Sequence, residues 1–353
     1  MRLDELDLKS EDYAPEPPTG KQLKIGLVGC GAIANSAHLP AYRDFGYDVV
    51  ACMDIDSGAV ASTCSRWGVP RGSTKLDELL HDPEVEVVDL AVHANVRPEV
   101  LPKIAAAGKP ILSQKPLALD WASAKQMVRS AEQAGVPLMV NQQARWAPAH
   151  RAIKVLVDRG VCGPLYSVAH VRRSWQDHSD RWWRHLKDFN LVDHGVHYID
   201  LARYFTGRSP DAVSCATAVV PGQRAVSPLC HSLLMHFDGG DVLCTEHFNN
   251  IAPSPAAHSD TWYLDGVEGS IVGTQQWVEV SRKDAPDRRV RFPIEGRWFP
   301  DAFGGSMAEM MTAVTEGREP LTYGRDNLNS IKTAFAAVRS SEEGRTVRLG
   351  EFG

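Results

Sequence analysis

One segment near the start of the chain, residues 23–34, reads LKIGLVGCGAIA. Its first half, Leu23–Val28, is a run of aliphatic and β-branched residues typical of a buried strand. Its second half has the form G-x-G-x-x-A, in which Gly29 permits a tight turn and Gly31 lets a pyrophosphate approach the backbone. The small Ala34 lets the following helix pack on the strand. Because amides at a helix N-terminus attract anions, the segment predicts a phosphate-binding turn between a strand and a helix.

An acidic residue stands where a dinucleotide-binding domain needs one. Asp48–Met53 is predicted as the second strand, and Asp54 follows it directly. A carboxylate at this strand end accepts hydrogen bonds from a ribose diol and repels a 2′-phosphate, which favours NAD over NADP. Asp56 is an alternative for this role, and a purely structural glycine turn is the competing interpretation. The cofactor-binding residues expected in this part of the chain are Gly29, Gly31, Ala32, Ile33, Asp54 and Ile55.

Strand-like and helix-like segments alternate through the rest of the first half. Short continuous apolar strands separated by helices are typical of a parallel sheet covered on both faces, the doubly wound arrangement. Further strands are expected at Val85–Val92, Pro110–Ser113 and Pro137–Val140, and helices at Gly58–Trp67, Glu99–Ala107 and Trp121–Ala134. The pattern predicts an α/β fold class with an N-terminal Rossmann domain.

The pattern changes after about residue 141. Longer alternating runs follow one another there, and turn signals such as Asp238-Gly239-Gly240 separate them, which indicates antiparallel hairpins. Helices are expected at Val192–Tyr204, Gly305–Glu316 and Asp326–Arg339. We therefore predict three parts: a mobile acidic tail or subunit-binding arm over residues 1–21, an NAD-binding Rossmann domain over 22–141, and an α+β domain with a large, mostly antiparallel open sheet over 142–353.

Composition limits the function further. The chain has 353 residues and a formal net charge of −6, so its overall charge does not favour binding to nucleic acid or to an anionic membrane. Its seven cysteines are scattered and form no C-x-x-C pair, which argues against a disulfide framework or a zinc site and predicts a cytoplasmic protein. The N-terminus lacks the apolar stretch of a signal peptide, and no apolar run is long enough to span a bilayer.

Several segments in a fixed order resemble one family. They are residues 24–34, the run ILSQKPLA at 111–118, the run DHGVHYID at 193–200 and the closing region around 305–345. Together they resemble the glucose–fructose oxidoreductase / inositol dehydrogenase (Gfo/Idh/MocA) family from about residue 23 to residue 349. The resemblance implies an NAD-dependent oxidoreductase acting on a sugar or cyclitol bound in the second domain next to the nicotinamide. It also implies a homodimer or homotetramer, often formed through the open sheet.

The resemblance assigns three catalytic residues. Lys115 matches the lysine of the family's E-K-P motif, which touches both cofactor and substrate, and Asp193 and His197 match its D-x-x-x-H pair. Elementary chemistry supports these roles, because oxidising an alcohol requires a base and imidazole titrates near neutrality. Residues four apart on a helix share one face, so Asp193 can orient His197. The competing interpretations are an exposed lysine, a buried core histidine, and a metal pair formed by His194 and His197, for which a third ligand is missing.

The chain departs from the family pattern at three places. Gln114, which with Lys115 is expected among the cofactor-binding residues, replaces the glutamate before the lysine and removes a negative charge beside Lys115. The stretch after the fourth strand contains His93 and Ala94, whose backbone is expected near the nicotinamide half of the cofactor. Bulkier residues at 187–190 replace a glycine cluster and are expected to reshape the substrate entrance. Arg145 and Trp146, after the sixth strand, are further cofactor-binding candidates, with packing between the domains as the alternative.

The segment 172–187, RRSWQDHSDRWWRHLK, is the most distinctive in composition. Tryptophan faces suit the apolar faces of sugar rings, and arginine suits anionic groups on a substrate. The expected substrate-binding residues are Lys115, Arg173, Trp175, His178, Trp183, Asp193, His194 and His197. A solvated loop with tryptophans anchored in the core or at an interface is the competing interpretation, and nucleic-acid binding is disfavoured by the acidic neighbours.

We therefore expect an NAD-dependent dehydrogenase that oxidises a ring hydroxyl of a sugar, sugar derivative or cyclitol, whether neutral or anionic, with His197 as acid/base. Two alternatives remain open. The same residues also suit a redox-neutral enzyme that oxidises a glycoside transiently and then eliminates its aglycone. The other alternative is a non-catalytic, NAD-binding regulatory protein.

Overall fold

The computed structural model describes residues 3–178 and 182–353. These residues fold into two compact units. The first, the Rossmann unit, comprises residues 15–147 and 297–328, and the second, the open-sheet unit, comprises the described residues of 1–14, 148–296 and 329–353. Within the described residues, no helix combines the length and apolar character needed to cross a membrane.

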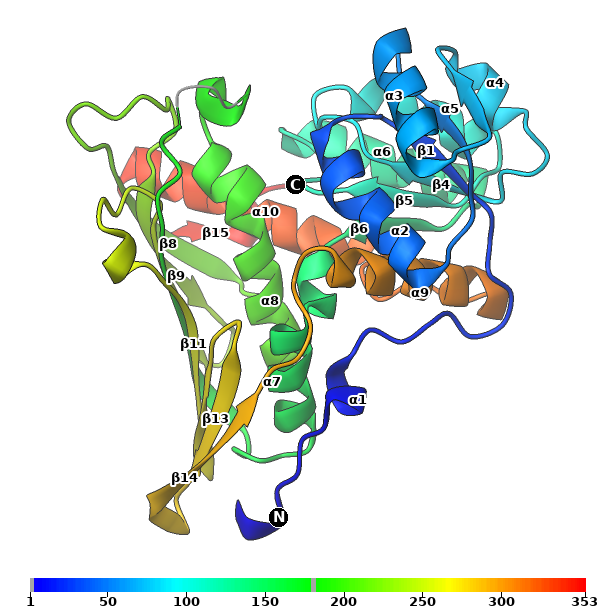
Figure 1. Cartoon of the computed structure of the whole chain (residues 1–353). Helices are drawn as coiled ribbons and strands as arrows, with labels where there is room; N and C mark the ends of the chain where they lie inside the picture. The colour runs from blue at the N-terminus through cyan, green and yellow to red at the C-terminus, as the bar shows by residue number, and fades with distance from the viewer. Residues whose placement is uncertain (1–2, 179–181) are drawn as a thin grey trace. The chain divides into compact units, whose positions relative to one another are not determined.

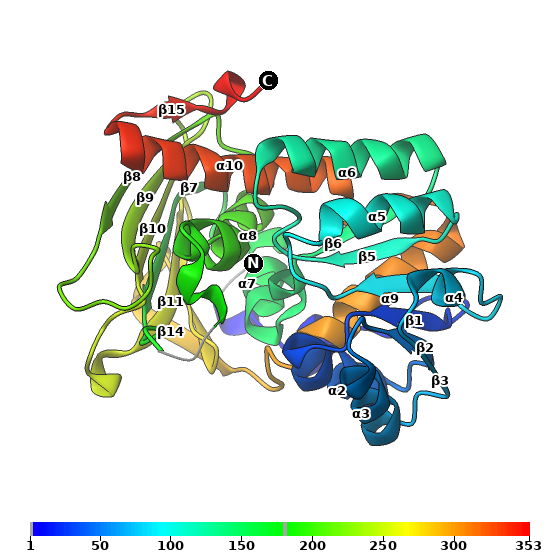
Figure 2. The same cartoon turned by 90° about the horizontal axis from the view of Figure 1, so that it is seen from above.

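The Rossmann unit is built on a six-stranded sheet in the order β3-β2-β1-β4-β5-β6 (Figure 2). All its neighbouring strands are parallel. The strands are β1 (Ile25–Val28), β2 (Val49–Met53), β3 (Arg71–Ser73), β4 (Val87–Leu90), β5 (Ile111–Gln114) and β6 (Leu138–Asn141). The helices are α2 (Leu39–Phe45), α3 (Ser57–Trp67), α4 (Leu76–Leu80), α5 (Arg97–Ala106), α6 (Trp121–Ala134), α9 (Asp301–Glu316), the π-helix η2 (Ala34–His38) and the short η3 (Gln143–Trp146). The predicted doubly wound parallel sheet is confirmed.

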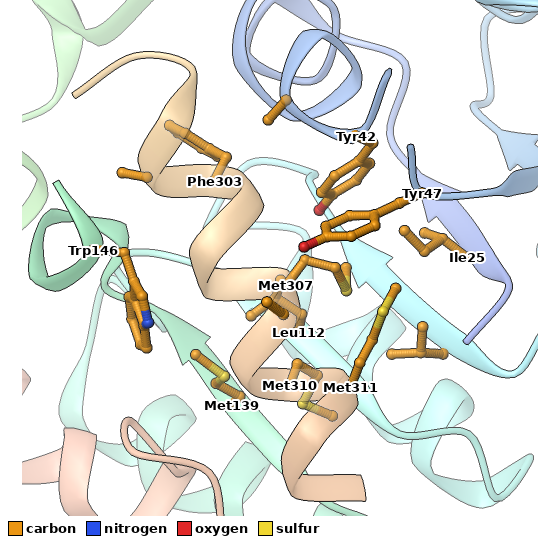
Figure 3. Packing of buried hydrophobic residues seen from close by; sticks show 14 of the residues in the cluster. Ile25, Tyr42, Tyr47, Leu112, Met139, Trp146, Phe303, Met307, Met310 and Met311 are labelled. Atoms are coloured by element: carbon orange, nitrogen blue, oxygen red, sulfur yellow. The ribbon is translucent and has the colours of Figure 1, made fainter. Parts of the chain in front are cut away.

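Helix α9 comes from the C-terminal region of the chain but packs in the Rossmann unit. Its Phe303, Met307 and Met310 are fully buried. Figure 3 shows these side chains and Met311 lying among Tyr42, Tyr47, Leu112, Met139 and Trp146. Burying each side chain of this size contributes about 1.5–3 kcal/mol, so α9 is an integral part of the unit's core. From its position in the sequence alone, this helix is expected in the second domain, residues 142–353.

The open-sheet unit contains a nine-stranded sheet in the order β14-β13-β12-β11-β7-β10-β9-β8-β15. Only the β7–β10 pair is parallel, so the predicted mostly antiparallel sheet is confirmed. The strands are β7 (Leu165–Arg173), β8 (Ala212–Ala218), β9 (Cys230–His236), β10 (Leu243–Asn249), β11 (Ser259–Gly266), β12 (Gly269–Gly273), β13 (Trp277–Arg282), β14 (Ala285–Pro293) and β15 (Val347–Arg348).

Helices cover one face of this sheet (Figure 1). They are α7 (Pro148–Asp158), α8 (Val196–Thr206) and α10 (Gly324–Glu343), of which residues from 329 onward belong to this unit. Shorter elements of the unit are η1 (Leu3–Glu5), α1 (Ser10–Tyr13), η4 (Trp182–His185), the π-helix η5 (Phe189–His194), η6 (Pro255–Ala257) and η7 (Leu349–Glu351). Side chains alternate along each strand between the helix-covered face and the opposite face.

The N-terminal residues 3–14 pack on the open-sheet unit. Leu3, Leu6, Leu8 and Tyr13 are buried despite the acidic composition of the segment. The Tyr13 hydroxyl accepts a hydrogen bond from the backbone N–H of Glu295 at 3.0 Å, and Arg151 donates to the Tyr13 carbonyl at 3.0 Å. The acidic composition predicts a mobile tail or subunit-binding arm over residues 1–21. The difference arises because apolar residues are interspersed among the acidic ones and anchor the segment.

Candidate functional site

The glycine loop after β1 leaves room for a ligand. Gly29 has φ of 106°, and a Cβ there would lie 2.9 Å from the carbonyl carbon of Ala91, so only glycine fits. A Cβ on Gly31, in contrast, would meet no atom within 4 Å. The space in front of Gly31 is therefore open, and the first helical turn begins beside it. This arrangement fits a pyrophosphate bound by backbone amides.

Asp54 lies beside this loop. Its Oδ2 accepts a hydrogen bond from the Cys30 N–H at 2.8 Å, and its Oδ1 accepts one from the Asp56 N–H at 3.0 Å. Asp56 instead caps α3 by accepting from the N–H groups of Gly58 and Ala59. A carboxylate has lone pairs for further bonds, so of the two acids Asp54 is the better placed to bind a ribose. The neighbouring Ile55 side chain is exposed.

A buried arginine joins the ends of β4 and β5. The Arg97 guanidinium donates to the carbonyl oxygens of Val92 at 3.0 Å and Lys115 at 3.3 Å, and also to that of Pro116. Arg97 is 2% exposed, so these bonds hold the backbone that carries Lys115. Arg97 was not predicted from the sequence. The one signal it offers there is a basic residue directly before a proline at the start of a helix. Of the predicted residues in the same β4–α5 turn, His93 is exposed and Ala94 is buried.

Buried amide side chains gather at the ends of β5 and β6. Gln114 and Gln142 are both buried, the second completely. Among residues 3–178 and 182–353, neither Oε1 of Gln114 nor either amide atom of Gln142 has a hydrogen-bond partner. Buried polar groups of proteins are nearly always paired, so these atoms mark a place for water or a ligand. Gln142 was not predicted, because a glutamine after a strand carries no specific signal.

Arg145 and Trp146 lie on η3 in the Rossmann unit. The Arg145 side chain is buried, donates to the Leu321 carbonyl at 3.4 Å and lies 3.9 Å from Asp326. Trp146 belongs to the apolar core around α9, as Figure 3 shows. A Cβ on Gly305 of α9 would lie 2.9 Å from the Trp146 ring. Both side chains thus take part in packing within this unit.

Asp193 and His197 lie on either side of a helical irregularity in the open-sheet unit. The π-helix η5 ends at His194, and α8 begins at Val196. A Cβ on the intervening Gly195 would lie 2.8 Å from the Leu191 carbonyl oxygen, so the turn requires glycine. Such π-turns occur often at functional sites. His197 is 5% exposed and Asp193 is half-buried.

The predicted substrate-binding residues of segment 172–187 lie in different surroundings. Trp183 is buried in an apolar cluster and stacks on Phe189 with ring centroids 4.1 Å apart, which is the packing of a core anchor. Trp175 and His178 are exposed. Arg173 follows Arg172 along β7, so it points to the sheet face opposite the helices. Arg181, in the same segment, lies outside the described residues.

A buried ionic cluster lies under α8 on the helix-covered face. Asp260 accepts hydrogen bonds from His170 Nε2 at 2.8 Å and from Arg172 Nη1 at 2.5 Å. Burial raises the pKa of Asp260, but the hydrogen bond from His170 and the electrostatic interactions with His170 and the Arg172 guanidinium outweigh burial and hold the pKa at about 2. Asp260 is therefore charged at neutral pH and acts as a counter-ion for Arg172.

These features define a two-unit protein whose Rossmann unit has a site that fits a dinucleotide. Residues 23–142 match the model of the oxidoreductase family with an NAD-binding Rossmann fold, and residues 150–277 match the GFO/IDH/MocA C-terminal domain. The chain belongs to the Gfo/Idh/MocA family. The resemblance stated from sequence, the NAD cofactor and the enzyme class are thereby confirmed.

Named relatives share most of the chain. The chain is 29% identical to D-apiose dehydrogenase of Paraburkholderia graminis over 342 residues. This aligned region covers 94% of this chain and 91% of that protein. An oxidoreductase from Agrobacterium radiobacter, solved with NAD+, L-tartaric acid and magnesium, has a TM-score of 0.84 at 23% identity and covers 94% of this chain and 100% of that chain. Levoglucosan dehydrogenase with NADH and levoglucosan has a TM-score of 0.81 at 22% identity, covering 93% of this chain and 100% of that chain. The two structures establish the likeness of fold.

Proposed function

We propose that the protein oxidises a ring hydroxyl of a sugar, a sugar derivative or a cyclitol. The observation that carries the proposal is the buried His197, four residues after Asp193 on a π-to-α turn that Gly195 makes possible. The names of the relatives support the substrate class, because D-apiose dehydrogenase and levoglucosan dehydrogenase are named for cyclic sugar compounds. When bound, NAD supplies the acceptor for the hydride that leaves the carbon of the reacting hydroxyl.

Each residue has a separate role in this proposal. His197 takes the proton of the reacting hydroxyl, because a neutral imidazole is a base at physiological pH. Asp193 orients the imidazole and stabilises the imidazolium that forms. Lys115 donates a hydrogen bond to the substrate oxygen and so reduces the cost of its developing negative charge. The carbonyl groups of residues 115 and 116 accept hydrogen bonds from Arg97, and these bonds hold the lysine backbone in place.

The reaction type is tested by following products and NADH together. The purified protein is given NAD and a pool of sugars, sugar acids, cyclitols and glycosides, while mass spectrometry records products and absorbance records NADH. We expect a product lighter by two hydrogens, with NADH rising in equal amount. Release of an aglycone without NADH would instead establish redox-neutral glycoside cleavage. A protein that binds NAD and changes nothing in the pool would contradict an enzymatic function of this class.

We further propose that the chain forms a homodimer or homotetramer through the uncovered face of its nine-stranded sheet. Tyr263 and Leu243 point to this face and are 43% and 48% exposed. Exposed apolar side chains on a sheet face are typical of an interface. Light scattering should give twice or four times the chain mass of 38.8 kDa, and Tyr263→Arg combined with Leu243→Glu should lower it. A wild-type mass equal to one chain would contradict the proposal.

A further inference from the structure

Beneath η5, buried polar side chains form a continuous chain of hydrogen bonds. Glu246 Oε1 lies 3.4 Å from His231 Nε2, and His231 Nδ1 lies 2.9 Å from Asn190 Nδ2. Asn250 Nδ2 lies 2.6 Å from Asn190 Oδ1 and 3.1 Å from His194 Nδ1. Apart from the half-buried His194, each member is at most 2% exposed. The chain thus links a buried carboxylate on β10 to the histidine that follows Asp193.

The donors and acceptors of these groups determine which partner donates in each hydrogen bond of this network. The Asn250 amide nitrogen carries only donors, so it donates to Asn190 Oδ1 and to His194 Nδ1. Asn190 donates in turn from Nδ2 to His231 Nδ1, which leaves the His231 hydrogen on Nε2, facing the Glu246 carboxylate. His194 accepts at Nδ1, so in the neutral imidazole its hydrogen is on Nε2.

Further hydrogen bonds hold the two asparagines in place. Asn250 Oδ1 accepts from the Ser174 hydroxyl at 2.6 Å. The Asn250 backbone N–H donates to the Leu229 carbonyl, and its carbonyl accepts from the Gln176 N–H, both at 2.8 Å. The Asn190 backbone N–H donates to the Ser227 hydroxyl at 3.1 Å. The Glu246 carboxylate can only accept, so it selects Nε2 as the position of the His231 hydrogen, and the orientations of the Asn190 and Asn250 amides follow from that position.

Aromatic rings surround His194. Its ring centroid lies 5.1 Å from that of Phe248, 5.9 Å from Phe189 and 6.1 Å from Tyr198. Charged and titratable groups contact these rings in turn: His170 and Arg172 on β7 contact both Tyr198 and Phe248, and His231 on β9 stacks on Phe248. Glu246 on β10 lies beyond His231, Asp260 on β11 accepts from Tyr198, and Asp193 and His197 lie on the same helical segment as His194. A proton added at His194 Nδ1 would break the bond from Asn250, because an imidazolium has no acceptor nitrogen.

We propose that Glu246, His231, Asn190 and Asn250 are positioning residues that keep His194 neutral, with its hydrogen on Nε2, so that it donates to an oxygen of the substrate. The inference rests on the proposed oxidation of a polyhydroxylated ring. It also gives the fully buried Asn190 side chain a role. The asparagine side chain supplies the middle link between the buried His231 and the turn.

The first test reads the tautomer directly. We would record nitrogen NMR spectra of the full-length protein labelled with 15N at histidine and assign the His194 signals by their loss in His194→Gln. We expect Nδ1 of His194 to be unprotonated and Nε2 protonated at neutral pH. A wild-type His194 with its hydrogen on Nδ1, or on both nitrogens, would overturn the proposal. This measurement needs no turnover, so it is independent of whether the proposed oxidation is correct.

The second test changes the donor to His194. In Asn250→Asp the new carboxylate cannot donate to Nδ1 and instead favours a proton there. We expect the acid limb of kcat/KM to move to higher pH by about one unit, which lowers kcat/KM about tenfold on that limb. The double variant with His194→Gln should lose this shift. Asn249→Asp is the matched control, because it adds the same charge one residue earlier, on the opposite face of β10.

These outcomes separate the possible failures. An Asn250→Asp profile that coincides with those of Asn249→Asp and the wild type would show that His194 has no such role in substrate binding. If Asn250→Asp does not fold, the wild-type tautomer still decides whether the hydrogen-bond chain acts as proposed. A wild-type protein that oxidises no polyol would contradict the proposed function, and the NMR result would remain a separate finding.

Discussion

His197→Ala is expected to lower kcat by about 10²–10⁴-fold while leaving NAD binding intact. A positioned general base contributes a factor of this size to proton transfer, and alanine has no group that takes the hydroxyl proton. NAD affinity should stay within about twofold, because the glycine loop and Asp54 belong to the Rossmann unit and make their contacts there. Steady-state kinetics with the substrate found in the product screen, together with calorimetric titration of NAD, would measure both effects.

Two further variants separate a catalytic His197 from a structural one. Asp193→Asn keeps the shape of the side chain but removes its charge, so kcat should fall less than in His197→Ala and the pH dependence should change. His185→Ala removes an exposed histidine of the same unit and should leave both kcat and the affinity for NAD unchanged. A His197→Ala enzyme that retains at least a third of wild-type kcat would refute the role of His197 as base. So would a loss of kcat fully accounted for by unfolding.

The sheet of the Rossmann unit was predictable because its strands are apolar throughout. All four residues of β1 are buried, and so are all four of β4, which matches a strand covered on both faces. The missed strand, β3, has only three residues, Arg71, Gly72 and Ser73, and lies at the sheet edge. It is a strand because it pairs with β2, which is distant in sequence, so no local pattern predicts it.

The assignment of α9 to a unit was not predictable from local pattern. Its apolar residues indicated a buried helix, but hydrophobicity does not specify which sheet a helix covers. Phe303 and Met307 pack in one buried cluster with Tyr42 and Met139, which are far away in sequence, and such contacts exist only in the folded chain. For the same reason, the burial of Leu3, Leu6 and Leu8 could not be inferred from an acidic N-terminal composition.

The candidate site shows the same division. The glycine loop and Asp54 have a local motif, so they could be named from the sequence and their surroundings fit a dinucleotide. Arg97 and Gln142 have none, because their importance comes from carbonyl groups and strand ends that the fold brings close. The spacing of Asp193 and His197 predicted one regular helix. The π-turn between them requires the close approach of Gly195 to the Leu191 carbonyl, which spacing alone does not reveal.

The second large effect is a loss of stability, and it concerns a cluster of three buried polar side chains in the Rossmann unit that have no assigned role in catalysis. His38 on η2 and Asp89 on β4 are fully buried, and His38 Nδ1 lies 2.7 Å from Asp89 Oδ2. The Tyr42 hydroxyl donates to the same oxygen at 2.7 Å. Burial, together with the negative charge of Asp89, also raises the pKa of Tyr42 well above its usual range. Removing one of these three side chains therefore leaves a buried polar atom of another without its hydrogen-bond partner.

We expect His38→Leu and Asp89→Leu each to lower the free energy of unfolding by about 3–5 kcal/mol, because each leaves one buried partner uncompensated. The double variant should lose only about 1–3 kcal/mol, the cost of leaving the Tyr42 hydroxyl without its acceptor. Urea unfolding followed by tryptophan fluorescence would measure all three, with His81→Leu as the control at an exposed histidine of the same unit. Losses that simply add in the double variant would show that His38 and Asp89 are not energetically coupled. A double variant that recovers most of the lost stability would show that these residues stabilise the unit through each other, since neither contributes much once its partner is gone.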